Sequence, residues 1–264
     1  AFSLGANTSG AQNTAVGTDA LVANTTASYN TAVGFEALGD TTTGEYNAGF
    51  GARALSENTT SSHGTAFGYN ALKVSTGGDN TAVGSNSSVT NTTGANNTAV
   101  GAWSLRYNTT GGSNTAIGYG ALDANTTASY NVGVGVDALG KNTTGTANCA
   151  VGGFALEDNT TGDNNTAVGR NALTNATTAD NNTAVGYAAA DALTTGASCT
   201  VVGKNALGVC STGGSNDAFG LGAGSDITTG SNNLCLGNAA GTAGGPNGAI
   251  TTNSDLIVIG NNSH

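Results

Sequence analysis

A short pattern of apolar residues and glycine recurs along almost the whole chain. It is first seen as Asn13-Thr14-Ala15-Val16-Gly17, followed by Ala20-Leu21 and by Asn24-Thr25-Thr26. Numbered from its Asn, as positions one to seventeen, the unit has fourteen copies, which begin at residues 13, 30, 47, 64, 80, 97, 114, 131, 148, 165, 182, 199, 216 and 233. Twelve of the thirteen intervals are 17 residues long and one, from 64 to 80, is 16. This regularity predicts that every copy occupies the same place in a stacked structure.

Three positions of the unit define the expected elements. Position five is Gly in all fourteen copies, which indicates either a positive φ or another backbone passing close by. Position four is always Val, Ile, Leu or Phe and position nine is usually Leu, so we expect both in the core of the coil. The pattern predicts one strand over positions two to four and a second over eight to eleven, which in the first copy are residues 14–16 and 20–23. The recurring Gly residues exclude long helices.

The predicted fold is all-β, a repetitive β-solenoid or β-roll with coils of about 17 residues. Coils that pair as parallel strands stack ~4.8 Å apart, which should place the Asn of position one and the Asn of position twelve in ladders. Residues 13–237 form the predicted array. Residues 1–12 are predicted to be a short capping repeat with Leu4-Gly5 in the Val-Gly positions, and residues 238–264 an irregular C-terminal cap that contains Pro246 and a last strand.

The apolar face of one coil is thin. With only positions four and nine large and apolar, burial contributes about 3–5 kcal/mol per coil, whereas ordering the backbone costs on the order of 1–2 kcal/mol per residue. A single solenoid of this kind has an under-filled core. If three chains meet along an axis, their position-four residues share one core, so the pattern favours a homotrimer over a monomeric β-helix.

Composition and charge limit the classes of protein and of binding partner that fit this chain. Gly accounts for 43 of 264 residues and charged residues for only 8%, but the fixed places of Val and Gly reject a disordered linker. The net charge of −10, with basic residues spread along the chain, predicts no nucleic-acid partner. No apolar run is long enough to span a bilayer, so no membrane insertion is expected. The four cysteines form no CxxC pair, and both free buried thiols and one or two disulfides fit their spacing: Cys149, Cys199, Cys210 and Cys235.

Candidate chemistry is sparse. The two histidines, His63 and His264, lie far apart in the sequence, and the acidic residues fall in predicted turns, so we expect no enzyme, no metal site and no cofactor. Four aromatic residues at variable positions of the repeat are the candidate ligand-binding residues, as a sugar-binding platform. The alternative is that they are isolated surface aromatics. They are Trp103, Tyr107, Tyr119 and Tyr69.

The string Asn-Thr-Ala-Val-Gly resembles the Asn-Ser-Val-Ala-Ile-Gly head repeats of trimeric autotransporter adhesins, which are trimeric left-handed β-rolls. The fuller unit, with Ala-Leu and Asn-Thr-Thr-Gly, resembles repeats of phage tail fibres and large bacterial surface proteins, of the kind that precede an endosialidase-type chaperone. The period of 17 is longer than that of the adhesin head.

This resemblance implies a structural fibre or adhesin stalk, extracellular on a cell surface or virion. Its expected partners are further copies of itself, as a homotrimer that can join end to end into filaments, and a cell-surface glycan or receptor. Two alternative functions remain open. One is an ice-binding solenoid, in which the Thr of position two forms a column one Thr wide with Ala beside it, and the other is a carbohydrate-binding solenoid.

Overall fold

The computed structural model describes residues 2–243 and 249–260. The chain divides into two compact units, Ala1–Asn131 and Val132–His264, and each unit is described by itself. Over the described residues both units consist of short strands and turns, without a helix. The predicted all-β solenoid with coils of about 17 residues is therefore confirmed. Pro246 and residues 261–264, which belong to the predicted C-terminal cap, lie outside the described residues.

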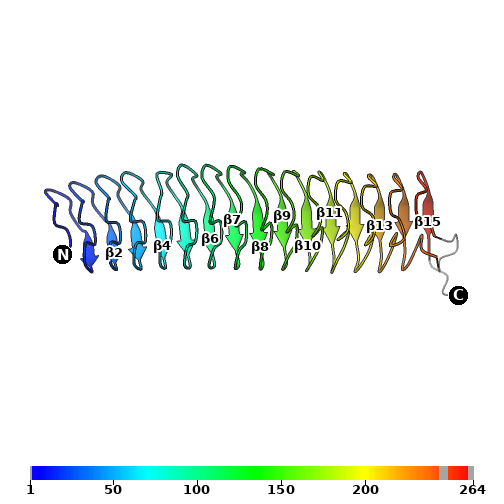
Figure 1. Ribbon diagram of the computed structural model, residues 1–264, viewed down its shortest axis with the longest axis horizontal. Coiled ribbons are helices and arrows are strands. Elements are labelled where there is room, and N and C mark those ends of the chain that lie inside the picture. Colours follow the sequence, from blue (N-terminus) through cyan, green and yellow to red (C-terminus); the bar gives the residue numbers. More distant parts are fainter. Residues whose placement is uncertain (1, 244–248, 261–264) are drawn as a thin grey trace. The chain divides into compact units, whose positions relative to one another are not determined.

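Each coil contributes one strand of three residues, at positions two to four of the repeat. Within each unit every strand pairs with the next one in parallel and in register, and even the 16-residue copy keeps the register through Thr65 and Thr81. The first unit contains β1 (Thr14–Val16), β2 (Thr31–Val33), β3 (Ala48–Phe50), β4 (Thr65–Phe67), β5 (Thr81–Val83), β6 (Thr98–Val100) and β7 (Thr115–Ile117) (Figure 1). The second contains β8 (Val132–Val134), β9 (Cys149–Val151), β10 (Thr166–Val168), β11 (Thr183–Val185), β12 (Thr200–Val202), β13 (Asp217–Phe219), β14 (Leu234–Leu236) and β15 (Ile257–Ile259).

The rest of each coil is a series of turns rather than a second strand. Residues 20–23, expected as a strand, are turn residues in which Ala20 and Leu21 are both fully buried. An extended chain points successive side chains to opposite faces, so two adjacent inward side chains need a folded backbone. Leu21 accordingly has a φ of 51°, in the left-handed region, as do Asp19 (58°) and Tyr29 (62°) at positions seven and seventeen. The prediction of a strand over positions eight to eleven was wrong.

The core of most coils is made of small residues around one leucine. In the first unit Ala32 at position three, Ala37 at position eight and Leu38 at position nine have no exposed surface. The position-four side chain points the other way, since Val16 is 57% and Val185 37% exposed. The expectation for position nine is confirmed, but the expectation that position four lies in the core of its own coil was wrong. Positions two and four of a strand share one face and position three has the other, and the inward face carries the smaller residue.

Gly at position five is required for two reasons together. Gly152 has a φ of 135°, a conformation that residues with a side chain rarely adopt. A Cβ at Gly152 would also lie 2.6 Å from the carbonyl oxygen of Gly169 in the next coil, closer than real Cβ atoms come to a backbone. Both explanations expected for this Gly therefore apply, and position five is a point of close backbone approach between successive coils.

Two asparagine ladders run along the stacked coils and confirm the prediction for positions one and twelve. At position twelve, the amide nitrogen of Asn108 donates to Asn91 Oδ1 (2.7 Å), and that of Asn125 donates to Asn108 Oδ1 (2.8 Å). At position one, Asn13 Oδ1 accepts the backbone N–H of Asn30 (2.9 Å) in the next coil. Buried amides are stable only when they are hydrogen-bonded, so each ladder ties one coil to its neighbour.

The N-terminal residues follow the same coil path. The N–H of Leu4 donates to the carbonyl of Ala20 (3.1 Å), as the N–H of Leu21 does to that of Ala37 (3.1 Å). Leu4 therefore occupies position nine rather than position four, so the predicted alignment of Leu4-Gly5 with the Val-Gly pair was wrong. From this position Leu4 packs against the core of the first unit.

Candidate functional site

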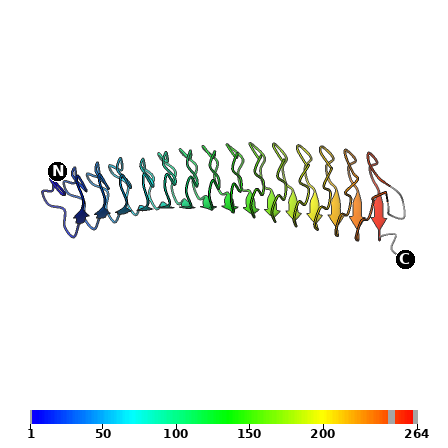
Figure 2. The same cartoon turned by 60° about the horizontal axis from the view of Figure 1, so that its bottom comes forward.

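The outward face of the sheet carries two parallel files of side chains, from positions two and four. Figure 2 shows that the strands lie along one side of the coils within each unit. In the second unit Thr183 pairs with Thr166 and Thr200, and Val185 pairs with Val168 and Val202. Because position three points inward, the residue beside each of these three Thr residues on this face is Val and not Ala. Across β10, β11 and β12 the surface therefore alternates a hydroxyl and an isopropyl group.

Only the apolar file is continuous over the described strands. Position four is Val, Ile, Leu or Phe in every strand, and the rings of Phe50 and Phe67 stack with centroids 5.3 Å apart. The threonine file is interrupted, because six of the described strands carry another residue at position two: Ala48, Val132, Cys149, Asp217, Leu234 and Ile257. Contiguous exposed apolar surface marks a site of interaction, and the apolar file extends over the described strands of each unit.

The structure brings three of the four predicted ligand-binding residues together. The Trp103 and Tyr119 rings lie 5.1 Å apart at an angle of 45°. The guanidinium of Arg106 lies 4.9 Å from the centre of the Trp103 ring and 4.3 Å from that of Tyr107. Arg106 also donates to Asp123 Oδ2 (2.9 Å), which holds it in place. Trp103, Arg106, Tyr107 and Tyr119 are here named the Trp103 cluster.

Tyr69 does not join this cluster. It is 51% exposed, and it lies two copies of the repeat earlier in the chain. That Arg106 is the centre of the cluster could not be inferred from the sequence, because the position of a turn residue in the repeat does not reveal which neighbouring coil it faces. The other three aromatics are 38–48% exposed and remain open to a ligand.

Ion pairs join neighbouring coils at positions seven, ten and eleven. Arg53 Nε donates to Glu36 Oε2 (2.8 Å), and this bond raises the pKa of Arg53. Lys141 Nζ lies 2.5 Å from Asp158 Oδ1, and the same kind of bond raises the pKa of Lys141. Such exposed pairs contribute little to stability. Their larger effect is to fill the surface between positions seven and ten with charged side chains.

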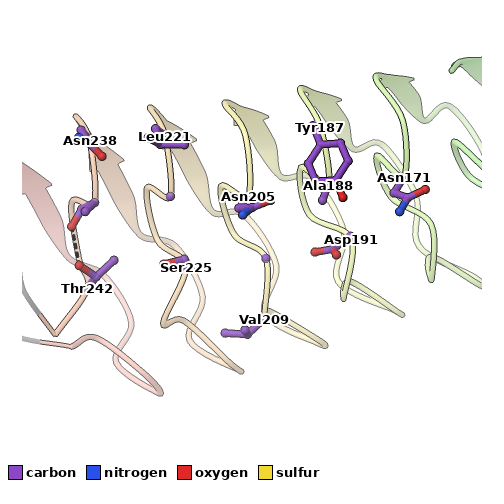
Figure 3. A pocket seen from close by; sticks show the side chains of 13 residues that line it. Asn171, Tyr187, Ala188, Asp191, Asn205, Val209, Leu221, Ser225, Asn238 and Thr242 are labelled. Atoms are coloured by element: carbon purple, nitrogen blue, oxygen red, sulfur yellow. Dashed lines mark hydrogen bonds between the residues drawn. The ribbon is translucent and has the colours of Figure 1, made fainter. Parts of the chain in front are cut away.

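In the second unit this surface opens into a groove of about 770 Å³, here named the C-terminal groove. Figure 3 shows two rows of side chains, with Asn171, Tyr187 and Leu221 in one and Asp191, Ser225 and Thr242 in the other. The groove opens because positions seven and ten carry small residues in several successive coils. These small residues are Ala188, Gly222 and Ala239 at position seven and Gly208 and Ser225 at position ten.

The groove was missed at the sequence level. Its signal was present, because from the copy at residue 182 onward position seven carries no charged residue and position ten carries one only at Asp191. The sequence does not reveal that positions seven and ten face each other on the surface. They do so because of the left-handed turn between them, at Leu207 (φ 52°).

The cysteines are not paired, which resolves the alternative left open by their spacing. All four are free thiols, and three are buried. Burial raises the pKa of Cys210 and of Cys235 to about 11. Among the described residues no group of three His, Cys, Asp or Glu side chains is arranged to hold a metal ion, and no helix is long and apolar enough to cross a membrane.

Comparison of the chain with protein-family models, with curated proteins and with solved structures gives no match.

Proposed function

We propose that this chain is a structural module of an extracellular fibre, assembled as a homotrimer through the position-four file. The observation that carries the proposal is the file itself, which leaves one apolar side chain per coil on the sheet surface. Val168, Val185 and Val202 remain 37–38% exposed, although each lies between apolar neighbours in the adjacent coils. Burying such a file is a source of association energy of about 25 cal/mol per Å².

A second copy of the chain is the partner that fits this file best. A partner that contacts one residue in every coil has to repeat with the same spacing as the coils, ~4.8 Å for parallel strands. Another copy has that spacing by construction, and it presents the same apolar residues. Three copies around one axis bring all three files into a common core. The position-four residues, which lie outside the core of their own coil, would then be buried in the core of the trimer.

The sequence resemblance supports the same assembly. The repeat is similar to those of trimeric autotransporter adhesin heads and phage tail fibres, and proteins of that kind stand on a cell surface or virion. In this proposal the solenoid spaces or presents a binding surface and performs no catalysis. The residues proposed to touch a cell-surface glycan or receptor are those of the Trp103 cluster, since it combines exposed rings with a fixed guanidinium.

The mass of the native protein in solution tests the assembly. Light scattering on a size-exclusion column should give three times the chain mass of 25.3 kDa. Val185→Asp, which places a charge in the file, should lower the mass toward that of one chain. Val209→Asp is the matched control, because Val209 is also exposed (48%) but lies at position eleven, outside the file. A wild-type mass of one chain would refute the trimer.

Binding by the Trp103 cluster is tested separately on a glycan array. Trp103→Ala should remove a signal given by the wild-type protein, whereas Tyr69→Ala, outside the cluster, should leave it unchanged. Loss of the signal in both variants, or in neither, would count against the cluster as the contact surface.

The sheet face also supports a second candidate function, ice binding. The specific observation is that Thr and Val form paired files over three successive strands, β10 to β12, as in Thr166/Val168 and Thr183/Val185. A flat, uncharged array with a regular spacing can order water. Thermal hysteresis of a dilute protein solution tests this function, and Thr183→Tyr should abolish the effect by disrupting the array. The absence of hysteresis in the wild-type protein would eliminate this candidate.

A further inference from the structure

We propose that the C-terminal groove binds an uncharged oligosaccharide, laid along the direction in which the coils stack. This inference goes beyond the fibre function, because it concerns a different surface from the position-four file and the Trp103 cluster. The groove is lined by residues of five successive coils, from Asn171 to Thr242 (Figure 3). Four coil spacings of ~4.8 Å give it a length of about 19 Å, and its volume of about 770 Å³ is in the range of ligand sites.

Two amides are available to a ligand because their position in the repeat leaves them unpaired. Where asparagines stand at position seven in adjacent coils they bond to each other, as Asn70 Nδ2 does with Asn86 Oδ1 (3.2 Å). In the groove Ala188 separates Asn171 from Asn205, so the two amides lie two coils apart. Neither side chain makes a hydrogen bond within the described part of the chain. Each amide offers both donors and an acceptor, the combination that recognises a hydroxyl group.

A carboxylate and apolar side chains complete the lining. Asp191 forms no ion pair with the described residues, and partial burial raises the pKa of its carboxyl. A carboxylate in this state accepts hydrogen bonds from neighbouring hydroxyls. Tyr187 and Leu221, 46% and 52% exposed, lie in the opposite row, where they can cover the C–H faces of a sugar ring. Alternating polar and apolar groups suit a chain of pyranose rings, which has hydroxyls at its edges and C–H groups on its faces.

The charges of the groove's lining favour a neutral ligand over an acidic one. No lysine or arginine lines it among the described residues, and its one ionisable acid is Asp191. A phosphate, sulfate or uronate would therefore meet the Asp191 carboxylate of the lining. Lys204 is not part of the lining, but its Nζ lies 5.8 Å from the centre of the Tyr187 ring, so a cation lies beside one lining residue. The comparable groove of the first unit, about 460 Å³, is lined instead by ion-paired side chains such as Arg53 with Glu36 and Lys73 with Glu57. These charged groups of the first unit's groove are thus paired with each other, whereas within the described part of the chain the amides of Asn171 and Asn205 in the C-terminal groove are not.

The chain provides its own matched pair of variants for testing the proposal. Gly208 and Gly140 both stand at position ten, and a Cβ at either would lie 3.2 Å from a carbonyl oxygen three residues earlier. Aliphatic side chains are accepted at this position, since Val22 and Val89 occupy it in other coils. Gly208→Leu fills the groove with a group that cannot form hydrogen bonds. Gly140→Leu makes the same change outside the groove.

A second variant deletes a hydrogen-bonding group without filling the groove. Asn205 has a φ of 55°, and alanine is found at the same position with a φ of 50° at Ala188 and 53° at Ala239. Asn205→Ala should therefore keep the coil while it deletes one of the two free amides. Circular dichroism checks that each variant is folded before binding is measured.

The experiment uses the full chain on an array of neutral oligosaccharides of glucose, mannose and galactose, together with acidic ones bearing sialic or uronic acids. Titration calorimetry then follows with the strongest neutral binder. We expect Gly208→Leu and Asn205→Ala each to weaken binding roughly tenfold or more, and Gly140→Leu and Trp103→Ala to leave it unchanged. The proposal is overturned if no neutral oligosaccharide binds, if only acidic ones bind, or if binding survives both groove variants.

Discussion

Replacing a glycine at position five tests the geometry on which the coil stack depends. Gly152 and Gly153 are neighbours in the sequence but differ in their surroundings. At Gly152 the backbone φ is 135°, and a Cβ would lie 2.6 Å from Gly169 O. At Gly153 the nearest atom to a Cβ would be Val136 O, at 3.9 Å. Gly152→Ala and Gly153→Ala therefore add the same methyl group in two different environments.

The expected cost of Gly152→Ala follows from these distances. To restore an ordinary contact the neighbouring coil must move by roughly 0.8 Å. That displacement would stretch the hydrogen bond from Gly169 N–H to Val151 O, now 2.8 Å, beyond a useful length. Loss of the bond costs about 1 kcal/mol, and the strained φ adds about 1–3 kcal/mol. We expect a decrease of about 3 kcal/mol in the free energy of unfolding.

Urea denaturation followed by circular dichroism measures this difference. Gly152→Ala should shift the unfolding midpoint downward by about 1 M urea. Gly153→Ala should leave the midpoint in place or raise it slightly, because alanine lowers the entropy of the unfolded chain. Equal midpoints for the two variants would refute the view that position five is a close approach between coils.

Three further outcomes are expected. Asn108→Ala should lower the free energy of unfolding by about 2 kcal/mol in the same urea assay, because it leaves the buried Asn91 Oδ1 without its donor; an unchanged midpoint would exclude the ladder as a stabilising feature. Burial raises the pKa of Cys210 and of Cys235 from 9.0 to about 11. The unfolded chain therefore loses these protons at lower pH than the folded chain does, and the free energy of unfolding should fall as the pH rises from about 9 to 11. Urea midpoints across that range test this, and C210S together with C235S should flatten the fall; a slope unaffected by both would contradict it. Native protein at pH 8 should also react slowly with iodoacetamide at these two thiols and rapidly in urea, as read by mass spectrometry; equal rates would show that they are not buried.

Several features of the coil could be predicted from sequence because they depend only on what repeats. A strict 17-residue period with Gly at position five requires every copy to meet its neighbour in the same way. The same reasoning predicted the asparagine ladders, since identical residues stack when coils are in register, as Asn91, Asn108 and Asn125 do. It also predicted the burial of leucine at position nine. These features follow from translation along the stack and do not depend on the path of the chain within a coil.

The candidate surfaces were only partly predictable. Trp103, Tyr107 and Tyr119 were recognised as exposed aromatics, but their meeting around Arg106 depends on contacts between positions that are distant in the repeat. The C-terminal groove was not foreseen, although the small residues that form it, such as Gly208 and Gly222, are visible in the sequence. Both surfaces depend on which turn residues of one coil face those of the next.

The sequence by itself determined the period, the stacking and the identity of the close contacts, because each is repeated at every copy. Only the tertiary structure decided which way the strand faces. Residue size suggested that Val at position four is inside, yet Ala15 and Ala32 point inward while Val16 and Val33 face outward. The reason is that Ala and Leu at positions eight and nine both turn into the coil, through left-handed backbone at Leu. Because the coil interior is filled in this way, the larger apolar residues are left on the sheet surface, where a partner can reach them.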